Sequence, residues 1–247
     1  MGEIYAGTSG WAYPKWKPRF YPAEVRSKDF LAYYATRLNS VEVNYTFLRP
    51  VTDALLAEWI AATPVGFRFA VKAPQLITHI KRLRGAESLA LDFLKSIEPL
   101  RKARKLGPVL FQLPPNMKSD LPRLQGFLKT LPKQERITFE FRHASWFADD
   151  VYAALREHDA ALCLAESEKI ETPEILTADF CYLRLRKADY LPKKVAERAR
   201  GLMRKTDVYL YFKHEDTPEG ALNAEAVLAA LSGLKRKPQR ESGDWNS

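Results

Sequence analysis

The sequence predicts an α/β fold, a single (β/α)8 barrel of the TIM type with parallel strands inside and helices outside. Short apolar segments alternate with longer amphipathic ones, which indicates a parallel sheet with helical crossovers. Eight strand candidates within 247 residues match the size of such a barrel. Polar side chains also gather at the ends of the strand candidates, where barrel enzymes carry their active sites.

Each expected strand is a short apolar run. The eight candidates are Ile4–Thr8, Ser40–Asn44, Phe67–Lys72, Val109–Gln112, Ile137–Arg142, Ala161–Glu166, Cys181–Arg186 and Val208–Lys213. Apolar residues recur at helical spacing in five longer stretches, which are Thr52–Ala62, Glu87–Lys105, Asp149–His158, Pro192–Arg204 and Ala221–Leu231. Between Glu166 and Phe180 we expect only a short crossover. A doubly wound open sheet competes, but the turn at Gly7-Thr8-Ser9-Gly10-Trp11 lacks the GxGxxG pattern of that fold.

The chain-wide features set the class of protein. We expect a barrel domain over residues 1–234 and a basic, disordered tail over residues 235–247. No apolar run reaches the length of a membrane helix, and the N-terminus lacks a secretion signal, so we expect a cytoplasmic protein without membrane contact. Lys and Arg outnumber Asp and Glu by 39 to 30, which favours anionic partners. Parity places Cys163 and Cys181 on the helix-facing side, as reduced, buried thiols.

The segment from Ile137 to His143 indicates where the chemistry lies. Successive side chains of a strand point to opposite faces, so Glu140 and Arg142 share one face and oppose a wholly apolar one. Six other strand candidates also place polar residues late on the face away from the helices, and these include Glu42, Asn44, Lys72, Gln112, Glu166, Arg184, Tyr211 and Lys213. Burying charges costs several kcal/mol unless they are paired or solvated. The pattern therefore predicts a polar pocket at the C-terminal mouth, and the alternative is a structural plug of mutually paired charges.

The residue types in this pocket suggest acid/base chemistry on an anion. Glu140 and Glu42 are candidate general acids or bases, because a shared pocket drives two carboxyl pKa values apart. His79 and His143 follow strand ends and are candidate proton shuttles. Candidate substrate-binding residues are cations, amides and aromatic walls, namely Lys72, Arg142, Arg184, Lys213, Asn44, Gln112, Tyr211 and Trp146, with Trp11 and Trp16 as further aromatic walls.

Five segments follow one another in a characteristic order. They are Gly7-Thr8-Ser9-Gly10-Trp11, Asn39 through Phe47, Lys72-Ala73-Pro74 with Ile77-Thr78-His79, Leu110 through Pro115, and Phe139 through Phe147. This set resembles the YecE-like family, catalogued as domain of unknown function 72, over residues 4–232. The resemblance implies a TIM-type barrel and no established reaction. It also adds Asn223 to the substrate-binding candidates, since Asn223-Ala224 matches the family.

Two loops depart from the family pattern. The family has a Leu-His-Gly turn after its seventh strand, where this chain has Leu185-Arg186-Lys187. After the eighth strand the family has Tyr-Phe-Asn-Asn, where this chain has Tyr211-Phe212-Lys213-His214. Barrels often bind phosphate with these two loops. The added cations indicate either a more anionic substrate or an altered function in this member.

Three hypotheses follow. The first is an enzyme acting on a small anionic or polar metabolite, a sugar or nucleotide phosphate, with Glu140 as principal acid/base and no cofactor. The second is a metal-dependent hydrolase, including endonuclease-like activity on nucleic acid, in which His79 and His143 join a carboxylate or His214. The third is a non-catalytic barrel that binds a ligand or RNA, suggested by the net charge of +9. The sequence leaves the oligomeric state open.

Overall fold

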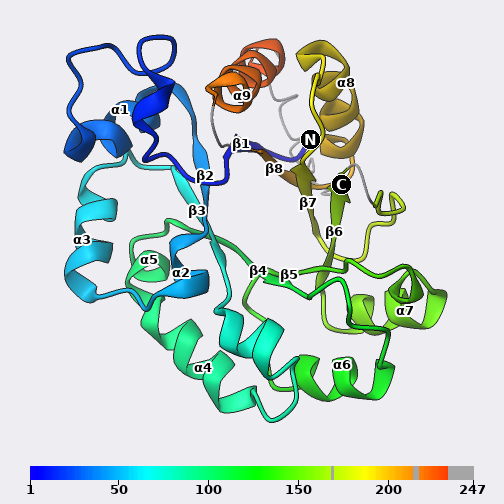
Figure 1. Cartoon of the computed structure of the whole chain (residues 1–247). Coiled ribbons are helices and arrows are strands. Elements are labelled where there is room, and N and C mark those ends of the chain that lie inside the picture. Colours follow the sequence, from blue (N-terminus) through cyan, green and yellow to red (C-terminus); the bar gives the residue numbers. More distant parts are fainter. Residues whose placement is uncertain (168–169, 214–216, 233–247) are drawn as a thin grey trace, which may run out of the picture.

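The computed structural model describes residues 1–167, 170–213 and 217–232, so the expected tail lies outside the described residues. Within these ranges eight parallel strands form a barrel surrounded by helices, which confirms the predicted (β/α)8 fold (Figure 1). The strands are β1 (Ile4–Thr8), β2 (Ser40–Val43), β3 (Arg68–Lys72), β4 (Leu106–Gln112), β5 (Ile137–Glu140), β6 (Ala161–Glu166), β7 (Phe180–Leu185) and β8 (Asp207–Phe212). The largest difference from prediction is at β4, whose Gly107 and Pro108 disguise its start, because neither residue is typical of a strand interior.

Helices cover the outside of the barrel (Figure 1). In the described residues they are α1 (Phe30–Arg37), α2 (Tyr45–Leu48), α3 (Asp53–Ala61), α4 (Glu87–Ser96), α5 (Glu98–Lys102), α6 (Leu121–Leu128), α7 (Asp149–Glu157), α8 (Pro192–Met203) and α9 (Glu219–Leu231). Short 3-10 turns lie at Pro14–Trp16, Ser27–Asp29 and Ala144–Trp146, and a π-helical turn lies at Leu76–Ile80. In the described part of the chain, no helix has the length and apolar character that crossing a membrane requires.

Two differences from the predicted helices have local causes. The single helix expected over Glu87–Lys105 is divided into α4 and α5, because the chain turns at Ile97 and Pro99 stands in the first turn of α5. The sequence pattern misses α1 and α6, which are only 8 residues long. Residues 170–179 between β6 and β7 hold no helix, as predicted.

The strands follow the order β1-β8-β7-β6-β5-β4-β3-β2, and every hydrogen-bonded pair among them is parallel. The register places Gln112 of β4 level with Glu140 of β5, and Ala165 of β6 level with Arg184 of β7. Since all strands run in one direction, their C-terminal ends meet at one end of the barrel. This common register brings the late polar residues of separate strands into one layer.

Side chains close the barrel between β1 and β2. The Tyr34 hydroxyl accepts the Thr8 N–H at 2.9 Å and donates to the Ser40 carbonyl at 2.9 Å. The Asn39 amide group makes two more hydrogen bonds to the β1 backbone, at 2.8 and 2.9 Å. The two strands therefore lie close together, and their C-terminal ends meet where the site begins.

The apolar side chains form two separate layers. The larger layer lies between the strands and the helices and includes Cys181. The smaller layer fills the inside of the barrel and consists of Tyr5, Ala70, Leu110, Ala161, Cys163, Ala165, Phe180, Tyr182, Tyr209 and Tyr211. Both cysteines are free and buried, as expected. The predicted side of Cys163 is wrong, because Leu162 and Leu164 take the helix-facing positions of β6 and leave the intervening residue inside.

The closeness of β1 and β2 predicts a strict requirement for Gly7. A Cβ atom built on Gly7 would lie 1.9 Å from the Ser40 carbonyl oxygen and 2.5 Å from the Tyr34 hydroxyl. We expect Gly7→Ala to lower the free energy of unfolding by about 1–3 kcal/mol or more, because the backbone must move to relieve the overlap. Gly126→Ala is the control, since its Cβ in α6 meets nothing within 4 Å and should stabilise the protein by about 0.5–1 kcal/mol. Equal stability of Gly7→Ala and wild type in urea unfolding would contradict this account of the seam.

Candidate active site at the barrel mouth

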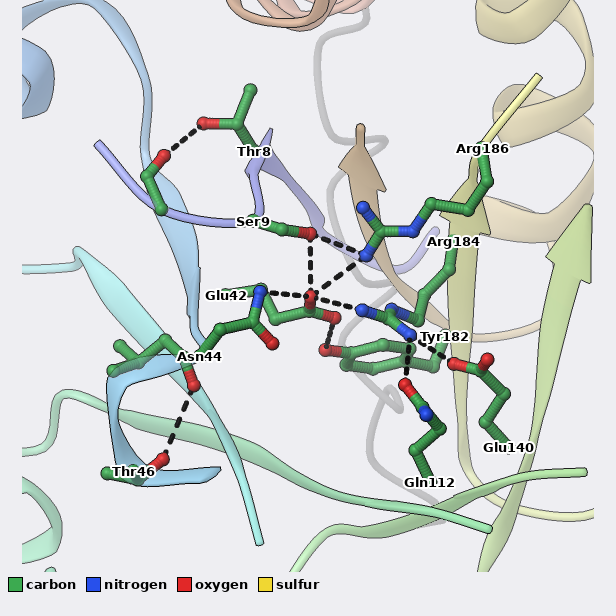
Figure 2. A network of polar contacts seen from close by, with 12 residues as sticks. Thr8, Ser9, Glu42, Asn44, Thr46, Gln112, Glu140, Tyr182, Arg184 and Arg186 are labelled. Carbon is green, nitrogen blue, oxygen red and sulfur yellow. Dashed lines mark hydrogen bonds and ion pairs between the residues drawn. The ribbon is translucent and has the colours of Figure 1, made fainter. Parts of the chain in front are cut away.

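A buried arginine occupies the centre of the C-terminal mouth. Arg184 Nη2 donates to Glu42 Oε1 at 2.8 Å, and Nη1 donates to Glu140 Oε2 and to Gln112 Oε1, the latter at 3.1 Å (Figure 2). The side chains of Arg184, Glu42 and Glu140 are 4%, 0% and 3% exposed. One guanidinium therefore links carboxylates from β2 and β5 across the barrel, and water has little access to either ion pair.

Glu42 receives hydrogen bonds from several further directions. Its Oε1 atom accepts from Ser9 Oγ at 2.6 Å and from Arg186 Nη2 at 3.0 Å, and its Oε2 atom accepts from the Tyr182 hydroxyl at 2.8 Å (Figure 2). Asn44 Nδ2 approaches Oε1 at 3.5 Å, while the buried Asn44 Oδ1 atom has no hydrogen-bond partner among the described residues. Glu42 thus accepts from donors that lie just after β1, just after β2, and on or just after β7.

Both carboxyl groups are held in their ionised forms. Burial by itself would raise the pKa of Glu42, but the charges of Arg184 and Arg186, with their hydrogen bonds and that of Ser9, hold this pKa well below its usual range. Burial likewise opposes ionisation of Glu140, and the charges of Arg184 and Arg142 overcome it, lowering the pKa to about 2. Arg142 Nε donates to Glu140 Oε1 at 2.7 Å. Neither carboxyl group of the free protein is positioned to give up or take up a proton near neutral pH.

Lys72 has a contrasting environment at the end of β3. Its side chain is nearly buried, at 8% exposure, and Nζ lies 3.8 Å from the centroid of the Phe47 ring. Within the described residues, no hydrogen bond or ion pair joins Nζ to another group. Burial, and then the positive charge of Arg184, lowers the pKa of Lys72 to about 8. Lys72 is therefore a mouth residue that changes its protonation state close to neutral pH.

His79 belongs to the π-helical turn that follows β3, and it lies beside Lys72. Irregular helical turns of this kind are frequent at functional sites. The His79 ring contacts Phe47 edge-to-face at a centroid distance of 5.0 Å, and Nδ1 lies 2.9 Å from Thr78 Oγ1. Partial burial, followed by the charges of Lys72 and Arg142, lowers the pKa of His79. The structure thus brings together seven of the predicted site residues, namely Glu42, Asn44, Lys72, His79, Gln112, Glu140 and Arg142, around Arg184.

Comparisons with known proteins bear on this arrangement. Residues 5–244 match the family model described as a protein of unknown function, DUF72. The chain belongs to this family. A curated relative, the UPF0759 protein YecE of Escherichia coli strain K12, is 34% identical over 147 residues, which cover 59% of this chain and 50% of YecE. The chain thus aligns with about half the length of that relative.

Solved structures agree with the assignment to DUF72. A DUF72 family protein from Thermotoga maritima MSB8 matches with a TM-score of 0.82 and 27% identity, covering 93% of this chain and 99% of that one. A family 2 AP endonuclease from Brucella melitensis matches with a TM-score of 0.53 and 9% identity over 96% of this chain and 100% of that one. The second likeness shows only that the barrel fold is shared.

Two aromatic residues predicted to line the mouth of this DUF72 chain do not do so. Trp146 is fully buried, stacks on Phe141 at 4.5 Å and donates its indole N–H to the Met117 carbonyl. Tyr211 is also fully buried, and its hydroxyl lies 2.6 Å from Ser40 Oγ inside the barrel. The position of each residue along the chain, after or within a strand, was predicted correctly. The alternation of side chains does not predict how deeply a side chain is buried, and both rings are covered by neighbouring residues.

The three remaining candidates, His143, Lys213 and Asn223, follow β5, follow β8 and lie in α9, respectively. His143 Nδ1 accepts the Ser145 N–H at 3.2 Å and so caps the short 3-10 turn that follows β5. Lys213 follows β8 with an exposed side chain, and Asn223 lies half-buried in α9, outside the barrel. His143 therefore makes a local structural contact, and the roles predicted for Lys213 and Asn223 stay predictions.

Glu166 lies on the opposite face of β6 from the one predicted. It ends β6 but lies on the helix side, where it pairs with Arg198 of α8 and accepts the Tyr190 hydroxyl at 2.9 Å. Leu162 and Leu164 occupy the same face of β6, so the alternation puts Glu166 outside the barrel. This strand therefore contributes no carboxylate to the mouth.

Three members of the network were not among the predicted site residues, although Arg186 was identified as an added cation after the seventh strand. Ser9 follows β1 directly, Tyr182 shares the inner face of β7 with Arg184, and Arg186 follows β7 directly. The sequence signals for them were the Gly7-Thr8-Ser9 turn, the alternation of side chains along β7, and the Leu185-Arg186-Lys187 segment. The sequence does not show that all three side chains hydrogen-bond to Glu42, because this residue belongs to β2 and is distant in the chain from at least two of them.

The described residues include no group of three or more His, Cys, Asp and Glu side chains arranged to hold a metal ion. His214, considered above as a metal ligand, lies outside the described residues. The oxygen atoms of Glu42 and Glu140 already accept from arginine, serine and tyrosine donors. A metal at these carboxylates would have to displace those contacts.

Glu42→Gln should destabilise the protein strongly. Removing this charge leaves the buried Arg184 with one anionic partner fewer, which costs about 3 kcal/mol or more in the free energy of unfolding. Glu171→Gln is the control, because the side chains of Glu171 and its partner Lys187 are 66% and 35% exposed, and such pairs contribute less than about 1 kcal/mol. The depressed pKa of Glu42 stabilises the fold above about pH 4, so the difference from wild type should narrow as the pH falls below that value. Urea unfolding at pH 7 and pH 3 measures both effects, and equal losses in the two variants would contradict them.

Proposed function

We propose that this protein is an enzyme whose barrel mouth binds a small anionic metabolite, a sugar phosphate or a nucleotide phosphate, and carries out acid/base chemistry on it. The observation that supports this most directly is the buried Lys72 ammonium at the mouth, which has no hydrogen-bond or ion-pair partner among the described residues. A buried charge without a partner is costly, and an anionic ligand would relieve the cost. Arg142, which is 38% exposed, and His79 adjoin Lys72 and would complete an anion site.

The balance of charge supports the same conclusion. Four cationic side chains, Lys72, Arg142, Arg184 and Arg186, share the mouth with two carboxylates. Since both carboxylates already accept from arginine, the excess positive charge is available to a ligand. Positive charge in a site of low water content attracts phosphate and carboxylate groups strongly.

The proton-transfer roles assigned from the sequence change within this proposal. A general acid or base works best when its pKa lies near the operating pH. Lys72, with a pKa of about 8, meets this condition, whereas Glu140, with a pKa of about 2, does not. His79 lies beside Lys72, and burial with the neighbouring cations lowers its pKa, which favours the neutral imidazole. We therefore assign proton transfer to Lys72 and His79, and assign Glu42 and Glu140 the task of positioning the arginines.

The metal-dependent hydrolase and the non-catalytic RNA-binding barrel receive less support. For the hydrolase, arginine already occupies the carboxylates that would hold a metal, and the likeness to an AP endonuclease extends to the fold alone. The RNA-binding alternative depended partly on the basic tail, which lies outside the described residues.

Binding of inorganic phosphate tests the proposal without knowledge of the substrate. Titration calorimetry at pH 7 should detect one phosphate site, and Lys72→Met should weaken it by about tenfold or more, since hydrogen bonds to charged groups contribute about 1.5–3 kcal/mol. Binding should also weaken as the pH rises above about 8, because the neutral amine no longer attracts an anion.

A second cationic hollow requires a control. A cavity of about 410 Å³ at the opposite end of the barrel is lined by several arginines, Arg104 among them. Arg104→Met should leave the mouth affinity unchanged, while neutral glucose should not compete with phosphate. Phosphate affinity that falls in Arg104→Met and not in Lys72→Met would overturn the proposed site.

A further inference from the structure

We propose that Lys72 is a nucleophile, whose ε-amine condenses with the carbonyl carbon of an aldehyde or ketone that also carries an anionic group. This inference rests on the proposed anion-binding function of the mouth and names the substrate class and the reacting atom. Lysine forms such covalent intermediates when its amine is desolvated or lies next to another cation. The surroundings of Lys72 combine both conditions.

The first argument is the contrast between two buried lysines. Lys105 is 6% exposed, and its Nζ atom donates to the Ile60 carbonyl at 2.7 Å, to Thr63 Oγ1 at 2.8 Å and to the Thr63 carbonyl. Burial lowers the pKa of Lys105 as well, but the three acceptors engage its amine on all sides and leave no open direction for a substrate carbon. Lys72 is buried to a similar extent, at 8% exposure, but makes none of these bonds within the described residues.

The second argument is the arrangement of charges. Lys72 lies near Arg184 and Arg142, which both oppose a further positive charge. The carboxylates that would favour the ammonium, Glu42 and Glu140, are bonded to arginines instead. Burial and these cations together lower the pKa of Lys72 to about 8, so a useful fraction of the amine is neutral at pH 7.

The chemistry closes without any oxidant or reductant. The Lys72 nitrogen lone pair forms a bond to the carbonyl carbon, while the C=O π electrons move to oxygen, which takes up the proton lost by nitrogen. One further proton expels this oxygen as water and leaves a protonated imine. His79 and Lys72 contact the same Phe47 ring, and the charge of Lys72 acts on the His79 imidazole. His79 is therefore close enough to Lys72 to deliver this proton. The protonated imine then withdraws electrons from the neighbouring carbon, which permits proton abstraction or carbon–carbon cleavage there.

Reductive trapping with glyoxylate tests the inference, because glyoxylate joins an aldehyde to a carboxylate. The full-length protein is treated at pH 7 with limiting glyoxylate and cyanoborohydride, and each modified lysine is measured by peptide mass spectrometry. We expect Lys72 to be modified about tenfold or more faster than exposed lysines, since its lower pKa gives a larger neutral fraction. Lys105 should remain unmodified, and phosphate should protect Lys72.

The outcomes separate this inference from the proposed function. Lys72→Arg keeps the cation, so it should still bind phosphate while trapping at this position is lost. If the variant does not fold, mapping of the wild-type protein still decides the question. Phosphate binding without selective trapping at Lys72 overturns the nucleophile, and selective trapping that phosphate does not affect overturns the anion site. Equal modification of Lys72 and exposed lysines likewise contradicts the inference.

Discussion

The ion pairs of Arg184 with Glu42 and Glu140 are the interaction on which the mouth of this barrel depends. A guanidinium buried away from water is tolerated when nearby anions meet its charge and acceptors meet most of its donors. Arg184 satisfies this through Nη1 and Nη2, while its Nε atom has no partner among the described residues. Three strands supply the anions and acceptors, and the parallel register brings their ends level. The closed contact between β1 and β2 then adds Ser9 to the same network. Barrel closure and site construction are therefore parts of one arrangement, since opening the β1–β2 seam would also remove a donor from Glu42.

The same ion pairs determine what the mouth can do. Because arginines satisfy both carboxylates, these groups cannot neutralise Lys72, which is buried beside Phe47 with excess positive charge around it. A protein that only needed stability would place an acceptor near this amine, as Lys105 shows within the same chain. An unpaired cation of this kind has a cost to folding, and such costs are typical of sites that bind or react. Under our proposal, this barrel combines a buried charged layer with an amine that the layer leaves without an ion-pair partner among the described residues.

Much of this could be predicted from the sequence, and the limits have physical causes. Strand parity located the mouth and named Glu42, Lys72, Glu140 and Arg184, because alternation on a strand is a local property. Pairing between strands is not local, so Glu140 was predicted to be an acid/base group when it is in fact bonded to two arginines. Alternation does not tell which face of a strand points inward when both faces are apolar, as in β6. For this reason Cys163 was predicted to face the helices and Glu166 the inside of the barrel, and the structure has them the other way round. Depth within the barrel decides the environment of Trp146 and Tyr211, and no sequence pattern encodes depth.

The protonation of Lys72 tests the central claim most directly. A carbon-13 label at the ε position of lysine allows each amine to be titrated by NMR, with Lys72→Arg assigning the Lys72 signal. The account predicts that Lys72 titrates near pH 8 in the ligand-free protein, about two units below an exposed lysine. Added phosphate should move this titration to higher pH, because an anion stabilises the ammonium form. A Lys72 signal that titrates above about pH 10 without ligand would show that the amine is fully paired, and would contradict the account.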